Sequence, residues 1–152
     1  MAFSPPRNIE IFDRITAYTL IKLYESFPIP LNLNLNEIYD EIAQDCTDEN
    51  EATQIYTTYI TSTILFLTEE KFIQHDQDPN LIISREYFSA KLTLKGLALL
   101  GAIPKTVNER INNTPQSSFI ELLKDSFKVG TKSALSDVFR SLWIHALRNI
   151  SD

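Results

Sequence analysis

The side chains that most often carry out catalysis or bind metal ions are few in this chain and stand far apart in it. The sequence contains two histidines, His75 and His145, and one cysteine, Cys46, each in a different predicted element. A structural zinc site needs about four converging sulfur and nitrogen ligands, so these residues predict no zinc site. Nucleophilic catalysis needs a serine or cysteine close to a base, and no spacing singles out such a pair. The three side chains are therefore interpreted as ordinary strand, helix and loop residues.

One acidic run, residues 45–51, has the density of carboxylates that calcium-binding loops use. Counted from Asp45, however, Asn50 stands where such a loop needs glycine, and Tyr56 stands where it needs a bidentate glutamate. The run is therefore interpreted as a solvated loop. Asp48 or Asn50 is expected to cap the helix that follows, where acidic side chains suit the helix N-terminus.

Glycine, which lets a backbone approach a phosphate group closely, occurs three times, at Gly96, Gly101 and Gly130. Neither a phosphate-binding loop nor a dinucleotide-binding fingerprint can be assembled from so few glycines. Together with the missing metal and nucleophile patterns, this predicts a protein that holds no metal or cofactor and has no catalytic residues. We expect that it is not an enzyme.

The net charge of −6 is unevenly distributed along the chain. Residues 1–104 hold 7 Lys or Arg against 15 Asp or Glu, a net of −8, whereas residues 105–152 hold 7 against 5, a net of +2. Nonspecific binding to nucleic acid depends on Lys and Arg side chains that neutralise phosphates. The acidic first part therefore disfavours such binding, although nucleic acid stays a candidate partner.

The expected compartment is the cytoplasm. No window approaches the run of about 18 apolar residues that a membrane span needs, so no membrane span is predicted. Residues 1–6 have neither the basic nor the apolar stretch of a secretion signal, and the lone cysteine cannot form an intramolecular disulfide.

The hydrophobic pattern divides the first two thirds of the chain into helices and short strands. Apolar residues three and four apart predict a helix that Asn8 caps and Pro28 ends. Alternating leucine and asparagine residues predict a short strand over residues 29–35. Asn36 is expected to cap a short helix over residues 37–44.

The pattern continues with a longer helix, a hairpin and a further helix. The longer helix is predicted over residues 51–68 from its length and broad apolar face, although it is rich in Tyr, Ile and Thr, which favour strands. Two strands are predicted over residues 71–75 and 85–93, joined by a turn rich in Asp, Pro and Asn. Thr93 is expected to begin a helix over residues 94–100.

Two short motifs accompany this order of elements: Leu67-Thr68-Glu69-Glu70-Lys71-Phe72-Ile73 and Leu92-Thr93-Leu94-Lys95-Gly96-Leu97. With the order of elements, they resemble the winged-helix branch of the helix-turn-helix superfamily, of a bacterial or phage type. The first motif is similar to the end of the third helix running into the wing, and the second to the entry into the last helix. The resemblance covers residues 8–104 and implies a winged-helix-like domain. The expected fold is thus mainly α with a small β-sheet (α+β), plus a C-terminal amphipathic helix.

The resemblance implies either DNA binding, with the third helix in the major groove and the wing on the backbone, or a protein-interaction role, which many members have. The candidate DNA contacts are Gln54, Thr57, Thr58, Thr61, Arg85, Lys91 and Lys95. Residues 51–70 contain no Lys or Arg, and Asp76 and Asp78 in the wing turn would stand close to phosphate. We therefore favour a non-enzymatic interaction module with an unknown protein partner, and keep a dimeric DNA-binding transcriptional regulator as the alternative.

The last third of the chain is predicted to be a polar linker, residues 105–116, followed by one amphipathic helix, residues 117–150, capped by Ser117 or Ser118. The apolar face of this helix is broad and includes a row of small residues, Ser126, Gly130 and Ala134, which would let another helix come close; alternatively, Gly130 is a bend or break in the helix. The residues expected to mediate assembly are Leu123, Phe127, Gly130, Ala134, Leu135, Val138, Phe139, Leu142 and Trp143.

An apolar face of this size must be covered. The cover is the chain's own first domain, a second copy of the chain, or another macromolecule. A membrane surface is a further alternative, because Lys and Arg alternate with aromatic residues, but Glu121, Asp125 and Asp137 interrupt the basic face. We expect self-packing or self-association, with a symmetric homodimer as the simplest result.

Overall fold

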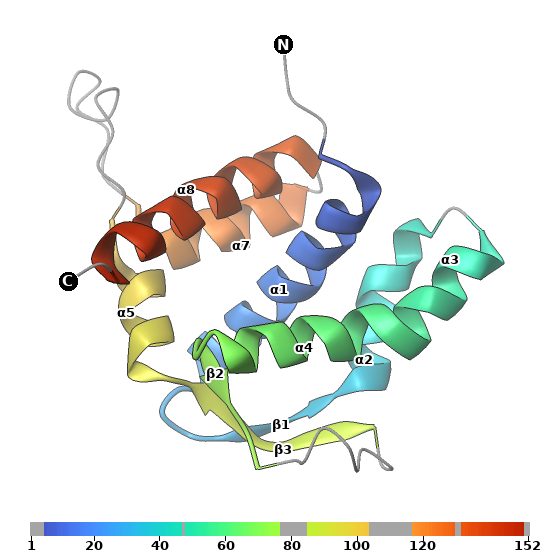
Figure 1. The fold of residues 1–152 in the computed structure, drawn as a ribbon, viewed down its shortest axis with the longest axis horizontal. Coiled ribbons are helices and arrows are strands. Elements are labelled where there is room, and N and C mark those ends of the chain that lie inside the picture. The colour runs from blue at the N-terminus through green and yellow to red at the C-terminus, as the bar shows by residue number, and fades with distance from the viewer. Residues whose placement is uncertain (1–4, 47, 77–84, 104–116, 130–131, 151–152) are drawn as a thin grey trace.

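The computed structural model describes residues 5–46, 48–76, 85–103, 117–129 and 132–150. These residues form a mainly helical α+β fold with a three-stranded antiparallel sheet (Figure 1), which confirms the predicted fold class. In chain order the elements are α1 (Arg7–Ser26), β1 (Leu31–Asn34), α2 (Leu35–Ile42), η1 (Ala43–Asp45), α3 (Glu49–Gln54), η2 (Ile55–Tyr59), α4 (Ile60–Glu69), β2 (Ile73–Gln74), β3 (Glu86–Leu92), α5 (Leu94–Gly101), α7 (Phe119–Val129) and α8 (Lys132–Ile150).

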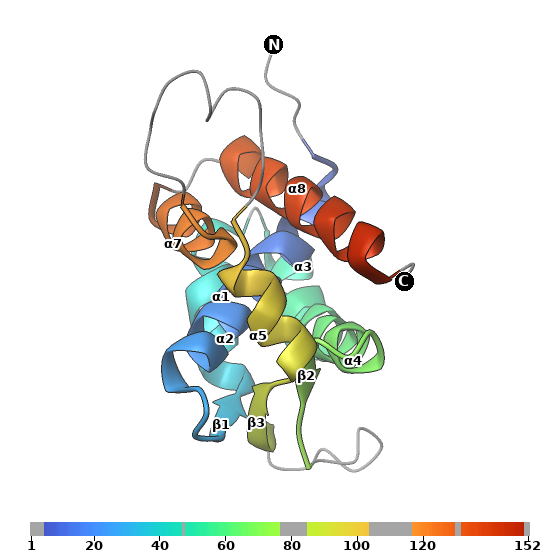
Figure 2. The same ribbon diagram turned by 90° about the vertical axis from the view of Figure 1, so that its left-hand side faces the viewer.

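Helix α1 crosses the middle of the molecule (Figures 1 and 2). It begins at Arg7, so the prediction that Asn8 caps it is wrong. Pro6 occupies the capping position, and its carbonyl accepts a hydrogen bond from the backbone N–H of Glu10 at 3.0 Å. The fixed φ of proline is already close to the helical value, which lets the helix start here without a side-chain cap.

Helix α2 is capped by Asn34 and not, as predicted, by Asn36. The Asn34 side-chain oxygen accepts hydrogen bonds from the backbone N–H groups of Asn36 at 2.8 Å and Glu37 at 3.2 Å. The predicted strand, residues 29–35, is shortened at both ends to β1. Ile29 belongs to a turn, where its backbone N–H donates to the Ser26 backbone oxygen at 2.9 Å, and Leu35 is already the first residue of α2. Leu35 is fully buried in this helical position, so its place in the alternating pattern did not distinguish strand from helix.

The predicted third helix is confirmed as a continuous run of α3, η2 and α4, which we call the third helix. Asp48, one of its two predicted caps, accepts a hydrogen bond from the backbone N–H of Glu51 at 2.7 Å. Inside the run, η2 is a π-helical turn. Ile55 and Ile60 are both buried although they are five residues apart, a spacing that a π-helical turn brings close to one face.

The sheet has the strand order β1-β3-β2, with both pairs antiparallel. Leu33 lies opposite Tyr87, and Ile73 lies opposite Leu92. This confirms the predicted hairpin, but β2 is shorter than expected. Most of the predicted turn, residues 77–80, lies outside the described residues.

Helix α5 begins as predicted at Thr93, which holds it against the start of β2. The Thr93 hydroxyl oxygen accepts from the backbone N–H of Gly96 at 3.0 Å and lies 2.6 Å from the carbonyl oxygen of Lys71, to which it donates. A Cβ atom at Gly96 would stand 2.3 Å from the backbone oxygen of Phe72. The threonine and glycine of the second motif thus have separate roles, in capping and in close packing.

The last third forms two described helices, α7 and α8, and the prediction of one continuous helix is wrong. Both pack on the side of α1 away from the sheet, and they pack against each other (Figures 1 and 2). Because α8 folds back along α7, apolar residues on both sides of the broad face can be buried. The predicted linker and Gly130 lie outside the described residues.

The apolar face of α7 and α8 is covered mostly by the rest of the same chain. Leu123, Leu135, Phe139 and Leu142 are each at most 5% exposed and belong to the same core cluster as the residues of α1. Phe127, Ala134, Val138 and Trp143 are half-buried. The self-packing expected from the sequence therefore covers most of this face, and the homodimer stays a prediction.

Candidate functional site

The third helix presents the polar residues that the sequence proposed as DNA contacts. Gln54, Thr57 and Thr58 are exposed, whereas Thr61 is half-buried. The Thr57 hydroxyl donates to the backbone oxygen of Thr53 at 2.8 Å, and the Thr61 hydroxyl donates to that of Thr58 at 3.1 Å. A phosphate oxygen needs a donor, and these two hydroxyl protons are already used within the helix.

Arg85, the candidate cation at the base of the hairpin, lies against the third helix. Its guanidinium carbon is 3.7 Å from the centre of the Tyr56 ring. Its side chain donates to the Asn36 side-chain oxygen at 2.8 Å and to the Tyr56 backbone oxygen at 3.2 Å. The Tyr56 ring also packs edge-on against Tyr39, with ring centres 5.2 Å apart. Arg85 therefore ties the hairpin to α2 and the third helix.

Lys95 and Lys91 are the other two candidate cations. The Lys95 ammonium group donates to the backbone oxygen of Glu70 at 2.9 Å and lies 4.5 Å from the centre of the Phe72 ring. Lys91 is a half-buried strand residue that pairs with Gln74. Glu70 directly follows the C-terminal end of the third helix, whereas Tyr56, which Arg85 contacts, lies in η2 in its first half. The structure does not bring the three cations together.

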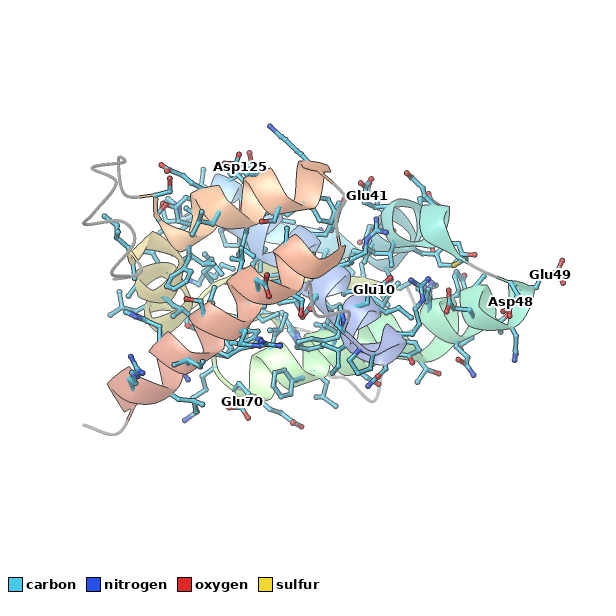
Figure 3. The ribbon with its side chains drawn as sticks, turned by 90° about the horizontal axis from the view of Figure 1, so that it is seen from above. Glu10, Glu41, Asp48, Glu49, Glu70 and Asp125 are labelled. Atoms are coloured by element: carbon cyan, nitrogen blue, oxygen red, sulfur yellow. The ribbon has the colours of Figure 1, made fainter. Side chains whose placement is uncertain are left out.

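Acidic side chains surround the beginning of the third helix. In Figure 3, Glu10, Glu41, Asp48 and Glu49 lie toward the end of the molecule where α2 and α3 meet. Arg7 bridges two acids here, since its Nε donates to Glu51 at 2.9 Å and its guanidinium also pairs with Glu10. This end of the helix therefore presents mainly negative charge.

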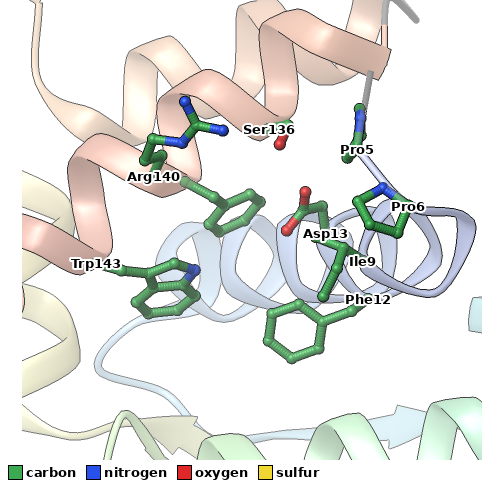
Figure 4. Close-up of a pocket in the computed structure, with 9 residues that line it drawn as sticks. Pro5, Pro6, Ile9, Phe12, Asp13, Ser136, Arg140 and Trp143 are labelled. Carbon is green, nitrogen blue, oxygen red and sulfur yellow. The ribbon is translucent and has the colours of Figure 1, made fainter. Parts of the chain in front are cut away.

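A cavity of about 450 Å³ lies between α1 and α8 (Figure 4), and it was not predicted from the sequence. Its walls are mostly apolar, with one carboxyl, one hydroxyl and one guanidinium group. The lining residues are Pro5, Pro6, Ile9, Phe12, Asp13, Ser136, Phe139, Arg140 and Trp143.

The carboxyl group of Asp13 is the most unusual feature of this cavity. Asp13 is 4% exposed, and Figure 4 shows its carboxyl pointing from α1 toward α8. Burial raises the pKa of Asp13 from 3.8 to about 7, a hydrogen bond with the Ser136 hydroxyl opposes this rise, and the nearby Glu10 carboxylate adds to it. Burial therefore favours the protonated form of this carboxyl compared with a solvated aspartate.

Aromatic rings form the other side of the cavity. The rings of Phe139 and Trp143 are stacked, with centres 5.5 Å apart and an angle of 19° between planes. Phe12 lies 6.5 Å from Trp143 and packs edge-on against Phe66 of α4 at 5.5 Å. Phe139 and Trp143, predicted as assembly residues, thus line a cavity inside one chain.

One sequence signal pointed to this cavity. Asp13 stands four residues after Ile9 and three before the buried Thr16, so it lies on the apolar face of the first helix. A carboxylate at such a position must be protonated or partnered. Its partner, Ser136, could not be identified, because the sequence did not show that α8 folds back onto α1.

The lone histidines and the cysteine take part in no common site. The His75 ring packs on Tyr87 with centres 4.7 Å apart, and the His145 ring packs on Phe119 at 5.6 Å. Burial raises the pKa of the half-buried Cys46 thiol, which makes it a weaker nucleophile. The described part of the chain contains no group of three His, Cys, Asp or Glu side chains arranged to hold a metal ion.

No family model, curated protein or solved structure matches the chain. Among the described helices, none has both the length and the apolar character that crossing a membrane requires.

Proposed function

We propose that this chain is a non-enzymatic winged-helix module that binds a protein partner through the exposed face of its third helix. Three helices followed by an antiparallel hairpin, with β1 added at the edge of β3, support the winged-helix part of the proposal. The cap and close packing at Thr93 and Gly96 support it further, because they give a physical basis to the motif that carries the resemblance.

The observation that carries the protein-binding part is that Arg85 and Lys95, the cations beside the third helix, already have partners within the fold. Arg85 is stacked on Tyr56, and Lys95 is bonded to the backbone of Glu70. Moving either side chain to a phosphate would break contacts that join secondary structure elements. The third helix itself contains no Lys or Arg, and acids surround its beginning. Both facts disfavour binding to a polyanion.

A protein partner fits the exposed face of the third helix better. Leu65 and Phe66 are 40% and 42% exposed, and Leu65 stands one helical turn after Thr61 on the same face. The centres of protein interfaces are depleted of charged residues and contain aromatic and apolar side chains. A surface of threonine, leucine and phenylalanine therefore costs less to desolvate than a charged one.

Fluorescence anisotropy with a labelled random duplex tests the first half of the proposal. At physiological salt we expect no binding at micromolar protein concentration. Micromolar binding that weakens steeply with added salt would contradict the proposal, because such dependence marks phosphate neutralisation.

Affinity capture from cells that express the chain tests the second half. We expect Leu65→Asp to abolish capture of proteins that the wild type retains, since a charge would be buried in the interface. Leu94→Asp, at an 80% exposed position on α5, is the matched control and should capture the same proteins as the wild type. Equal capture by both variants would show that the partner surface lies elsewhere.

A DNA-binding transcriptional regulator is the second candidate, favoured by the same order of elements. In that case Lys91→Ala combined with Lys95→Ala should weaken binding to a specific duplex through lost phosphate contacts. Unchanged affinity in the double variant would exclude the DNA surface assigned to these residues.

A further inference from the structure

The cavity between α1 and α8 has a different set of lining residues from the third-helix face of the proposed function, although Phe12 in its wall packs against Phe66 of that face. Its volume of about 450 Å³ is in the range of small-molecule sites, about 300 to 1,000 Å³. Such sites are mostly apolar and contain a few polar groups that orient the ligand. The combination of Asp13, Ser136 and three aromatic rings has this character.

The charges around the cavity favour a positively charged ligand group. Asp13 is 4% exposed, whereas Arg140 in the α8 wall is exposed, so the ionisable group buried in the cavity wall is the acid. Glu10, on the same helix as Asp13, adds a second acid close by, and Arg7 pairs with that acid and with Glu51 of α3. Of the two acids only Asp13 lines the cavity, so an anionic ligand would have to place its own charge beside the Asp13 carboxyl.

The aromatic wall favours a cation for an independent reason. The face of an aromatic ring carries negative electrostatic potential and attracts ammonium groups. Phe12, Phe139 and Trp143 also provide an apolar surface for the body of a ligand. A carboxylate with aromatic rings beside it is suited to an organic cation that has both a charged end and an apolar end.

We propose that this cavity binds a small organic ammonium compound, with its ammonium group at the Asp13 carboxylate and its apolar body against Phe12, Phe139 and Trp143. The Ser136 hydroxyl keeps the carboxyl oriented toward the cavity. This activity goes beyond the protein-binding role proposed above and uses a different surface.

The ion pair requires ionised Asp13, so ligand binding is linked to proton release. Because burial raises the pKa of Asp13 to about 7, binding below this pH must displace the proton from the carboxyl. The affinity should therefore rise roughly tenfold per pH unit up to about pH 7 and level off above it. Glu10 on α1 and Arg140 on α8 are the other charged groups that face this position.

The fluorescence of Trp143, the single tryptophan of the chain, reports directly on the cavity. Three probes with the same phenyl-ethyl body separate the ligand classes: phenethylamine, phenethyl alcohol and hydrocinnamate. At mildly alkaline pH we expect phenethylamine to bind about tenfold more tightly than the alcohol, and hydrocinnamate to bind most weakly. Calorimetry in buffers of different ionisation enthalpy should detect proton release below about pH 7.

Asp13→Asn removes the charge and keeps the size of the side chain. It should weaken phenethylamine binding about tenfold and leave the alcohol unchanged, since only the amine uses the ion pair. Asp137→Asn, at an exposed position of α8, is the matched control and should leave both affinities unchanged.

Three results would overturn the proposal, and all are measured on the wild-type chain. Tightest binding of hydrocinnamate would identify Arg140 as the anchor. Equal binding of amine and alcohol at every pH would show an apolar cavity without an ammonium site. Absence of any fluorescence change or heat with millimolar amine would show that the cavity does not accept this class.

Discussion

At the scale of single residues, Gly96 shows why one position tolerates no side chain. A Cβ atom there would stand 2.3 Å from the Phe72 backbone oxygen, a distance that requires the backbone to move. We predict that Gly96→Ala lowers the free energy of unfolding by about 1 to 3 kcal/mol, the usual cost of overpacking. Urea unfolding measures this loss.

Gly101 provides the control within the same helix, because a Cβ atom added there would meet none of the described residues outside its own stretch of helix within 4 Å. Gly101→Ala should be neutral or slightly stabilising, since alanine has the higher helix propensity. Equal destabilisation by the two substitutions would mean that close packing is not the role of Gly96.

Two buried threonines of α1 have hydroxyl groups whose desolvation lowers the free energy of unfolding, and a substitution can remove this cost. The hydroxyl oxygens of Thr16 and Thr19 are buried and have no hydrogen-bond partner among the described residues. We predict that Thr16→Val raises the free energy of unfolding by about 1 kcal/mol, because valine has the same shape and no polar group to desolvate. Thr53→Val, at an exposed site, is the control and should give no such gain. A loss of stability in Thr16→Val would instead indicate that the Thr16 hydroxyl has a hydrogen-bond partner.

At the scale of elements, the contact between α1 and α8 should make stability depend on pH. The pKa of Asp13 is about 7 in the folded chain and 3.8 when solvated, so the folded state binds the extra proton between these values. The contribution of Asp13 to the free energy of unfolding should then fall as pH rises from about 4 to 7 and stay level above 7. Asp13 is thus least favourable to the fold at neutral and alkaline pH.

Comparison with Asp13→Asn isolates this effect from the other titrating groups. Between about pH 5 and pH 7 the wild type should lose about 2 kcal/mol relative to the variant, since one pKa unit corresponds to about 1.4 kcal/mol. Chemical denaturation at several pH values measures the difference. Parallel stability curves for the two proteins would show that Asp13 titrates normally in the fold.

The helix caps and the π-helical turn show which local features could be predicted from the sequence. Caps with an immediate partner were predictable, as at Asp48 and Thr93, whose donors lie within three residues. Asn34 and Asn36 could not be separated as caps, because they stand on either side of Leu35, which fits the end of a strand or the start of a helix. The π-helical turn was not predicted, since a pattern based on one α-helical period cannot detect a single wide turn.

The candidate site was less predictable than the fold, because it depends on contacts between distant parts of the chain. Nothing near Arg85 in the sequence indicates that it stacks on Tyr56, and nothing near Asp13 indicates Ser136. The face of α8 was correctly identified as apolar, but periodicity does not reveal which surface covers it.

At the scale of the whole molecule, α7 and α8 complete the core that the first part of the chain leaves open. Trp143 lies 5.3 Å from Phe72 between ring centres, and Phe127 lies 6.5 Å from Tyr18. We predict that a chain ending at Gln116 exposes this apolar surface, binds a hydrophobic dye and loses cooperative unfolding. A cooperative thermal transition in the shortened chain would show that the first part folds independently.

The same internal cover predicts the state of assembly. Because the apolar residues of α7 and α8 face α1, light scattering should find a single species of 17.4 kDa. A species of twice that mass would instead support the symmetric homodimer expected from the sequence. It would then have to use residues that remain exposed, such as Ile144 and Leu147, which are 45% and 68% exposed.

The position of α1 between the sheet and the α7–α8 pair also has a consequence for synthesis on the ribosome. Asp13 and Phe12 emerge early, but Ser136 and Trp143, which cover them, are translated near the end of the described chain. Until then the first helix exposes part of the surface that it finally buries. Such late long-range contacts slow folding and leave this apolar surface open to aggregation until the last helix has been made.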